Sequence, residues 1–186
     1  MLGSRAAESI ATFFGLGRSK LCPGTLGSLA AFPLWFLVLS LIKYFDLRRP
    51  LLILFALIAG LFFLAFEAIT IYTRENKTTD DPSEVVIDEV LGQLLSFLLS
   101  LFIISHTGKY TPDFFQEKYG YILIIFSFVT PFILFRIYDI GKPWIIGKID
   151  REMKGALGII LDDIGAGLLA GLTNIVLFKI LLFLFL

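Results

Sequence analysis

The sequence predicts an all-α membrane protein that forms one domain over residues 1–186. Hydrophobic residues make up 57% of the chain, twenty residues are Phe, and the mean hydropathy is +0.86. These values lie far above those of soluble globular proteins. The chain also contains several apolar runs of about 20 residues, the length that crosses the hydrocarbon core of a bilayer. We therefore expect a polytopic helical bundle of about five membrane-spanning helices with an active site on its cytoplasmic side.

The expected spans are separated by short polar segments. The apolar runs cover residues 26–45, 51–73, 86–105, 121–140 and 164–186. The segments between them contain the Pro, Gly, Asp and Lys residues that end helices. Residues 1–20 lack the apolar region and cleavage site of a signal peptide. They are expected to form an amphipathic helix at the membrane interface or a frayed terminus.

The charged residues are distributed unevenly between the two expected sides of the membrane. Ten of the sixteen Lys and Arg residues lie in the N-terminal segment, residues 74–84 and residues 136–161. The positive-inside rule therefore places the N-terminus in the cytoplasm. Twelve acidic residues lie on that side against three on the other, and Glu67 lies inside the second run. Because acidic residues contribute little to orientation, their excess indicates a functional site on the cytoplasmic side.

The composition excludes several classes of protein. The formal net charge is zero, which gives no basic field for binding nucleic acid. The single cysteine, Cys22, excludes a disulfide within the chain and a metal site built from several cysteines. The chain has one histidine, whereas a phosphohistidine route needs two on one side. Neither a Walker A motif nor a D-x-D aspartyl-phosphate motif is present.

The first polar stretch, CPGTLGSLAAFPLW, begins at Cys22 and leads into the first apolar run. Pro23 and Gly24 predict a turn, and Thr25 or Ser28 can cap the helix that follows. The free N–H groups and the dipole at such a helix start favour an anion such as phosphate. An ordinary Pro-Gly turn with a helix cap explains the same residues.

The second stretch, DDPSEVVIDEVLGQLLS, covers residues 80–96. The helical period places Asp88 and Gly92 on one face, with Glu89 beside them. Gly92 lacks side-chain bulk, which allows another helix to approach. Paired carboxylates at a membrane boundary suit a hard cation such as Mg²⁺. The alternative is a solvated helix start whose acidic residues favour the helix dipole.

The third stretch begins with FRIYDIGKPW, residues 135–144. Arg136 and Asp139 are three residues apart, so they share a helical face and can form an ion pair. The Gly and Pro on either side of Lys142 end the helix there. Arg136 and Lys142 can bind phosphate oxygens. The alternative is that both are cations whose long side chains reach from an apolar surface to the membrane interface.

The last apolar run begins within GIILDDIGAG, residues 158–167. Asp163 shares a face with Gly167 and Gly171, and Asp162 lies on the adjacent face. Rows of small residues at this spacing mark close helix packing in membranes. Asp163 is therefore expected to point into the bundle, where an ionisable side chain is a functional candidate.

The stretches PGTLGSLAAFPLW, DPSEVVIDEVLGQ, FRIYDIGKPW and DREMKGALGIILDDIGAG, in this order, resemble the signature of the phosphatidylglycerophosphatase A family. The resemblance covers most of residues 13–172. It implies an all-helical, Mg²⁺-dependent phosphomonoesterase of the bacterial inner membrane. Its substrate would be the membrane lipid phosphatidylglycerophosphate, which it would convert to phosphatidylglycerol in the last step of that lipid's synthesis.

The residue patterns and the resemblance lead to one expected site. Asp88, Glu89 and Asp163 are the expected Mg²⁺ ligands. A carboxylate that does not bind the metal would act as general acid or base. The other candidates are the phosphate ligands Thr25, Ser28, Arg136 and Lys142 and the further carboxylates Asp162, Asp139 and Asp81.

A different class of function remains open at this point. Carboxylates inside a membrane also form the ion paths of small transporters. Such a path needs polar residues through the whole depth of the bundle, whereas the acidic residues here crowd one face. A headgroup transferase that uses Mg²⁺ and aspartates would carry a D-G-x-x-A-R run, which this chain lacks. The phosphatase is therefore the leading hypothesis.

Overall fold

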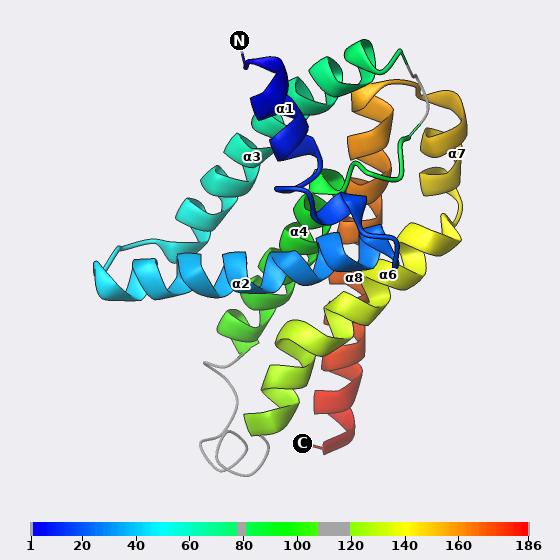
Figure 1. The fold of residues 1–186 in the computed structure, drawn as a ribbon. Coiled ribbons are helices and arrows are strands. Elements are labelled where there is room, and N and C mark those ends of the chain that lie inside the picture. Colours follow the sequence, from blue (N-terminus) through cyan, green and yellow to red (C-terminus); the bar gives the residue numbers. More distant parts are fainter. Residues whose placement is uncertain (1, 78–80, 108–119, 186) are drawn as a thin grey trace.

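The computed structural model describes residues 2–77, 81–107 and 120–185, and every regular element in these ranges is helical (Figure 1). The predicted all-α class is confirmed. In chain order the elements are α1 (Ser4–Ala11), the 3-10 turn η1 (Leu16–Arg18), α2 (Pro23–Tyr44), α3 (Pro50–Glu75), α4 (Ile87–Thr107), the π-helical turn η2 (Ile125–Val129), α6 (Thr130–Gly141), α7 (Ile145–Glu152) and α8 (Ala156–Phe185).

Each predicted apolar run corresponds to a helix. Four helical segments in the described part of the chain are long and apolar enough to cross a membrane, namely Pro23–Tyr44, Pro50–Glu75, Gly120–Gly141 and Ala156–Leu184. The remaining run forms α4, which lies in the middle of the bundle (Figure 1). Large apolar side chains cover the outside, including Phe63 (69% exposed) and Phe183 (86% exposed). Such a surface is suited to lipid and not to water, as expected of a membrane protein.

The helix boundaries differ from the predicted runs at two places that matter for the site. α2 begins at Pro23, because proline is preorganised for the first helical position. No side chain caps this helix, so the expectation that Thr25 or Ser28 would cap it is wrong. α8 begins at Ala156, earlier than the predicted run, and therefore carries Asp162 and Asp163 within its own second turn.

Glycines allow α4 and α8 to pack backbone against backbone. A Cβ atom on Gly167 would lie 2.3 Å from the carbonyl oxygen of Gly92. A Cβ atom on Gly92 would lie 2.6 Å from the carbonyl oxygen of Asp163. No side chain fits at either position. The predicted face of small residues is thus the surface by which α8 contacts α4. Asp163 lies one turn before Gly167 on this face, and its backbone therefore lies beside Gly92.

Polar side chains further along α4 and α8 join these two helices to the helical segment Gly120–Gly141. The amide of Asn174 donates to Ser100 Oγ (2.8 Å) and to the carbonyl oxygen of Phe126 (2.7 Å). Phe126 lies in η2, where the wider π turn departs from the regular i→i−4 bonding of an α-helix. Hydrogen bonds of this kind hold helices together in membranes, where burial of apolar surface alone gives little association.

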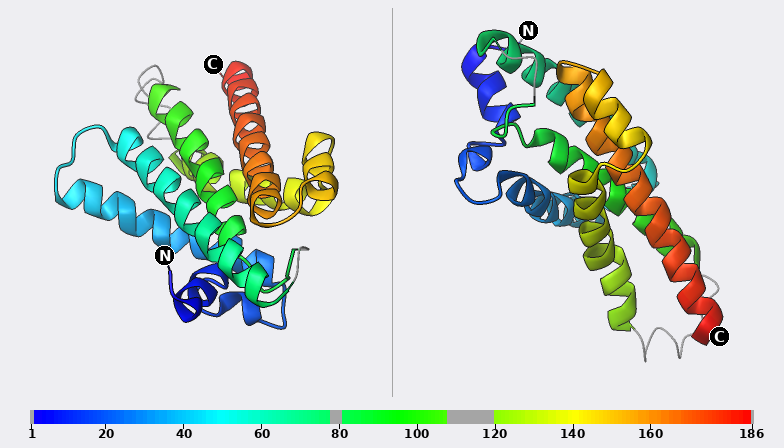
Figure 2. Two further views of the ribbon diagram at one scale, coloured as in Figure 1. Left: turned by 90° about the horizontal axis from the view of Figure 1, so that it is seen from above. Right: turned by 90° about the vertical axis from the view of Figure 1, so that its right-hand side faces the viewer.

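The N-terminal segment folds back onto the bundle, at the same end as α7 and the start of α8 (Figures 1 and 2). The predicted helix is present as α1, and its buried Ala7 and Ala11 face the protein. The backbone N–H of Leu2 donates to Glu67 Oε1 (2.8 Å), which gives the acidic residue inside α3 a partner. The N–H of Val86 donates to the carbonyl oxygen of Ala11 (3.0 Å). α1 therefore contacts the segment that leads into α4.

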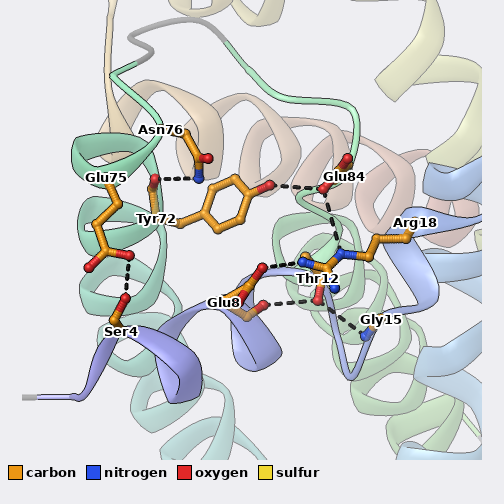
Figure 3. A network of polar contacts seen from close by, with 9 residues as sticks. All are labelled: Ser4, Glu8, Thr12, Gly15, Arg18, Tyr72, Glu75, Asn76 and Glu84. Carbon is orange, nitrogen blue, oxygen red and sulfur yellow. Dashed lines mark hydrogen bonds and ion pairs between the residues drawn. The ribbon is translucent and has the colours of Figure 1, made fainter.

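A polar network strengthens this attachment (Figure 3). Arg18 forms ion pairs with Glu8 and with Glu84 (Nε–Oε2 3.7 Å), and Tyr72 donates to Glu84 Oε2 (3.0 Å). Exposed ion pairs contribute little individually. The close packing beneath them is more restrictive, because a Cβ atom on Gly17 would lie 1.9 Å from the carbonyl oxygen of Glu84. The N-terminal segment thus packs tightly against the residues that lead into the first turn of α4.

The close contact between α4 and α8 can be tested with Gly167→Ala. The added methyl group forces the helices apart, so the free energy of unfolding should fall by about 1–3 kcal/mol. The matched control is Gly60→Ala in α3, where an added Cβ meets no atom within 4 Å. This control should be neutral or slightly stabilising, because Ala favours helix over Gly. Thermal unfolding in detergent measures both, and equal melting temperatures for the two variants would contradict the contact.

Candidate functional site

Three carboxylates from two helices meet beside the glycine contact. Asp88 and Glu89 lie in the first turn of α4, and Asp163 lies on the facing side of α8. One oxygen of each lies within 4.8 Å of the others. Asp88 and Asp163 are almost fully buried, with 3% and 4% of their surface exposed. The structure therefore brings together the three residues that the sequence analysis grouped as metal ligands, which we call the carboxylate cluster.

α6 adds a fourth carboxyl group and a cation to this cluster. The Asp139 carboxyl group lies near that of Asp163 and interacts with it electrostatically. Arg136 forms the predicted ion pair with Asp139, with 2.5 Å between Nη1 and Oδ2. The same Nη1 donates to Ser28 Oγ (3.2 Å), which ties the guanidinium to α2. Arg136 therefore sits at the edge of the carboxylates in a fixed orientation.

The cluster carries more negative charge than its own cation balances. Four carboxyl groups surround one guanidinium, and Asp88 Oδ1, Glu89 Oε2 and Arg136 Nε are buried without a hydrogen-bond partner. Burying charge without compensation is costly. All three residues offer the oxygen ligands that Mg²⁺ takes, and their oxygens gather within 4.8 Å, close to the roughly 4.2 Å that separates opposite ligands on one ion. The donor set therefore suits a hard divalent cation.

The first turn of α2 lies directly against this cluster. A Cβ atom on Gly24 would lie 2.3 Å from Glu89 Oε1 and 3.3 Å from both terminal nitrogens of Arg136. A side chain at this position would displace Glu89 and Arg136 from where they lie, which gives the glycine of the PGT motif a structural reason. Because no side chain caps α2, the leading N–H groups of the helix can bind an anion next to Arg136.

The two predicted hydroxyl ligands occupy different places on α2. Ser28 is fully buried and donates to the carbonyl oxygen of Gly24 (2.9 Å) while it accepts from Arg136. In this arrangement Ser28 orients the guanidinium. Thr25 is half-buried in the first turn of the helix, one residue after Gly24. It therefore lies at the end of α2 where the N–H groups are uncapped.

Lys142 lies apart from Arg136, in a second group of charges. It follows α6 with a left-handed backbone (φ 40°) and forms ion pairs with Asp150 of α7 and with Asp162 (2.7 Å). Burial alone would lower the pKa of Lys142, but the hydrogen bonds to these two carboxylates raise it above its ordinary value. Lys142 is therefore charged, and Asp162 pairs with it instead of joining the carboxylate cluster.

Asp81 lies between the two groups, in the segment that precedes α4. Desolvation and then the nearby Asp162 carboxylate raise the pKa of Asp81 to about 7, although its side chain keeps contact with solvent. Asp150 was not predicted as a partner of Lys142. The available signal was its place at the start of DREMKG, one of the stretches that carry the family resemblance.

Comparison with known proteins finds relatives over most of this chain. A curated relative named Phosphatidylglycerophosphatase A from Escherichia coli is 30% identical over 161 residues, which cover 87% of this chain and 77% of the relative. A protein of the same name from Haemophilus influenzae is 29% identical, with 87% and 82% covered. A protein named Putative phosphatidylinositol-3-phosphatase from Bacteroides thetaiotaomicron is 32% identical, with 85% and 84% covered. No solved structure shows a significant match.

The family comparison covers the whole candidate site. The sequence profile described as Phosphatidylglycerophosphatase A matches residues 9–178. This range includes the first turn of α2, the carboxylate cluster, Arg136 and the group around Lys142. Because the match spans most of the chain and contains each of these features, the protein belongs to the phosphatidylglycerophosphatase A family.

Proposed function

We propose that this protein hydrolyses the phosphomonoester of phosphatidylglycerophosphate and releases phosphatidylglycerol and inorganic phosphate. The observation that carries the proposal is the buried cluster of Asp88, Glu89 and Asp163 beside Arg136, in a chain of this family. A phosphomonoester carries close to two negative charges at neutral pH. Carboxylates alone would repel it, so the site must combine a bound cation with the guanidinium.

Asp88, Glu89 and Asp163 would hold Mg²⁺. The unpartnered oxygens of Asp88 and Glu89 and the closeness of all three residues support this assignment. When bound, the ion supplies Lewis-acid stabilisation of the phosphoryl group and eases deprotonation of the attacking water. The protein's own contribution is to hold three oxygen ligands in a nearly water-free place, where electrostatic interactions are strong.

Arg136 and the start of α2 would bind the phosphate oxygens. Arg136 Nε has no partner within the protein, and the N–H groups in the first turn of α2 are not capped by a side chain. Asp139 and Ser28 hold the guanidinium in place. We assign the acid–base role to Asp139, the carboxyl group of this site outside the three metal ligands. It lies near Asp163 and is paired with Arg136, so it can exchange a proton within the site.

We further propose that the site faces the cytoplasm from the bacterial inner membrane. The starts of α2, α4 and α8 and the end of α6 all contribute to the site, so these ends share one side. That side carries the larger share of Lys and Arg, which the positive-inside rule assigns to the cytoplasm. A lipid substrate would then reach the site from the inner leaflet.

The transporter alternative receives less support. An ion path needs polar groups that remain open along the bundle. In the described part of the chain, Asn174 bonds to Ser100 and to a backbone carbonyl, and Gln93 bonds to Ser96. The Asn174 amide nitrogen links α8 to α4 and to η2, whereas the Gln93 bond lies within α4 and leaves Gln93 Oε1 without a partner. These polar groups are single residues on the helices, and most acidic residues of the described chain gather at one end of the bundle, which favours the phosphatase over an ion path.

Replacing each of the two adjacent aspartates tests the metal assignment. Asp163→Asn should lower kcat/KM by more than about 100-fold, because changes at residues that merely support a metal ligand already cost about 10–100-fold. Asp162→Asn should leave unchanged the Mg²⁺ concentration that gives half-maximal activity. Phosphate release from phosphatidylglycerophosphate, measured across a Mg²⁺ series, checks both. A shifted Mg²⁺ requirement in Asp162→Asn together with normal turnover in Asp163→Asn would reverse the assignment.

A second pair of variants tests the phosphate ligand. Arg136→Gln should lower kcat/KM by about 10²- to 10³-fold, as removal of one preorganised donor does elsewhere. Its Mg²⁺ requirement should change little. Lys142→Gln should have a smaller effect, because the Lys142 ammonium is held by Asp150 and Asp162. Steady-state kinetics of both variants give the comparison, and an equal or larger loss in Lys142→Gln would contradict it.

A further inference from the structure

A cavity lies beside the carboxylate cluster. It has a volume of about 350 Å³ and opens between the segment before α4, α7 and the first turns of α8. Asp81, Asp150 and Asp162 contribute carboxylates to its wall, and Arg151 and Lys154 contribute cations. Asp162 directly precedes the cluster residue Asp163, so the two sites are neighbours on one helical turn.

The balance of charge differs between the two sites. Around the cavity, the three carboxylates face three cations, since Lys142 is bonded to Asp150 and Asp162. The carboxylate cluster instead has four carboxyl groups and one guanidinium. A balanced set of charges neither requires a metal ion nor strongly attracts a second phosphate. It offers closely spaced acceptors and donors, which suit a neutral ligand with hydroxyl groups.

One acceptor in this cavity lacks a donor. Asp162 is 5% exposed, and its Oδ2 is held by Lys142 at 2.7 Å. Its Oδ1 is buried and has no hydrogen-bond partner, although the residue lines the cavity. A buried carboxylate oxygen without a donor is unfavourable, and a ligand hydroxyl would satisfy it. Because Lys142 holds Oδ2, the carboxylate keeps one orientation, and Oδ1 lies just beneath the cavity surface, where a ligand hydroxyl would reach it after a small shift of the surrounding wall.

We propose that this cavity binds the glycerol of the lipid headgroup, with the free hydroxyl donating to Asp162 Oδ1. The inference rests on the proposed function, because it places the phosphomonoester at the adjacent carboxylate cluster. In phosphatidylglycerophosphate two of the three glycerol oxygens are esterified to phosphates, which leaves one hydroxyl for recognition. A phosphomonoester without that hydroxyl leaves Oδ1 without a donor, so the cavity selects for a hydroxylated headgroup.

Two soluble compounds isolate this interaction. Glycerol 3-phosphate carries the phosphomonoester and the hydroxyls, whereas propyl phosphate has the same carbon chain without hydroxyls. Binding of each to the full-length protein in detergent with Mg²⁺ is measured by the rise in melting temperature across a ligand titration. The wild type should bind glycerol 3-phosphate about tenfold more tightly, the effect of one hydrogen bond to a charged group.

The variants show whether this preference comes from the cavity. In Asp162→Asn the ratio of the affinity for glycerol 3-phosphate to that for propyl phosphate should fall toward one, while the affinity for propyl phosphate is retained. Asp150→Asn, which removes a second acceptor at the cavity wall, should reduce it in part. Glu152→Gln is the matched control on α7, because Glu152 is exposed and pairs with Lys148 across 3.9 Å. This control should keep the wild-type preference.

The result also separates this inference from the proposed function. Equal affinity for the two compounds in the wild type, no binding of either compound, or an unchanged preference in Asp162→Asn would overturn the cavity assignment. Phosphate release from phosphatidylglycerophosphate is measured separately with the wild type. Its absence would contradict the proposed function, whatever the binding experiment shows.

Discussion

The backbone contact between Gly92 and Gly167 is the constraint on which the site depends. It places α4 and α8 so close that Asp88 and Asp163, each about one turn from a contact glycine, face each other. Carboxylates that approach in a nearly dry interior repel one another. Helix packing must therefore hold them together, and the Asn174 amide supports that packing further along α8. Under the proposed function, metal binding and helix packing would be coupled for this reason.

The helical period explains why much of this arrangement could be predicted from the sequence. It placed Asp163 with the small residues of α8, and it paired Arg136 with Asp139, because both inferences need only positions along one helix. Lys142 was harder. The direction of the Lys142 side chain is set by the left-handed backbone of Lys142 itself, directly after α6. The partners of this side chain come from two later helices. The close fit of Gly24 against Glu89 likewise depends on how α2 meets α4, which no local pattern encodes.

Asp162 and Asp163 show how adjacent residues acquire different roles. Neighbouring side chains on a helix point about 100° apart, since one turn takes 3.6 residues. Asp163 therefore faces α4 and the excess negative charge, while Asp162 faces α7 and the cation of Lys142. One turn of α8 thus forms the wall between a site suited to a metal and phosphate and a cavity suited to a hydroxylated ligand.

The attachment of the N-terminal segment has a consequence for biosynthesis. Leu2 bonds to Glu67, and Ala11 bonds to Val86. Because both partners come much later in the chain, α1 emerges from the ribosome well before them. An amphipathic helix can rest at the membrane surface in the meantime, with its apolar face in the headgroup region. The carboxylate cluster assembles later still, because α8 supplies Asp163. A nascent chain therefore has no assembled site until α8 is in place, so the order of synthesis keeps the carboxylates apart until this helix has packed against α4.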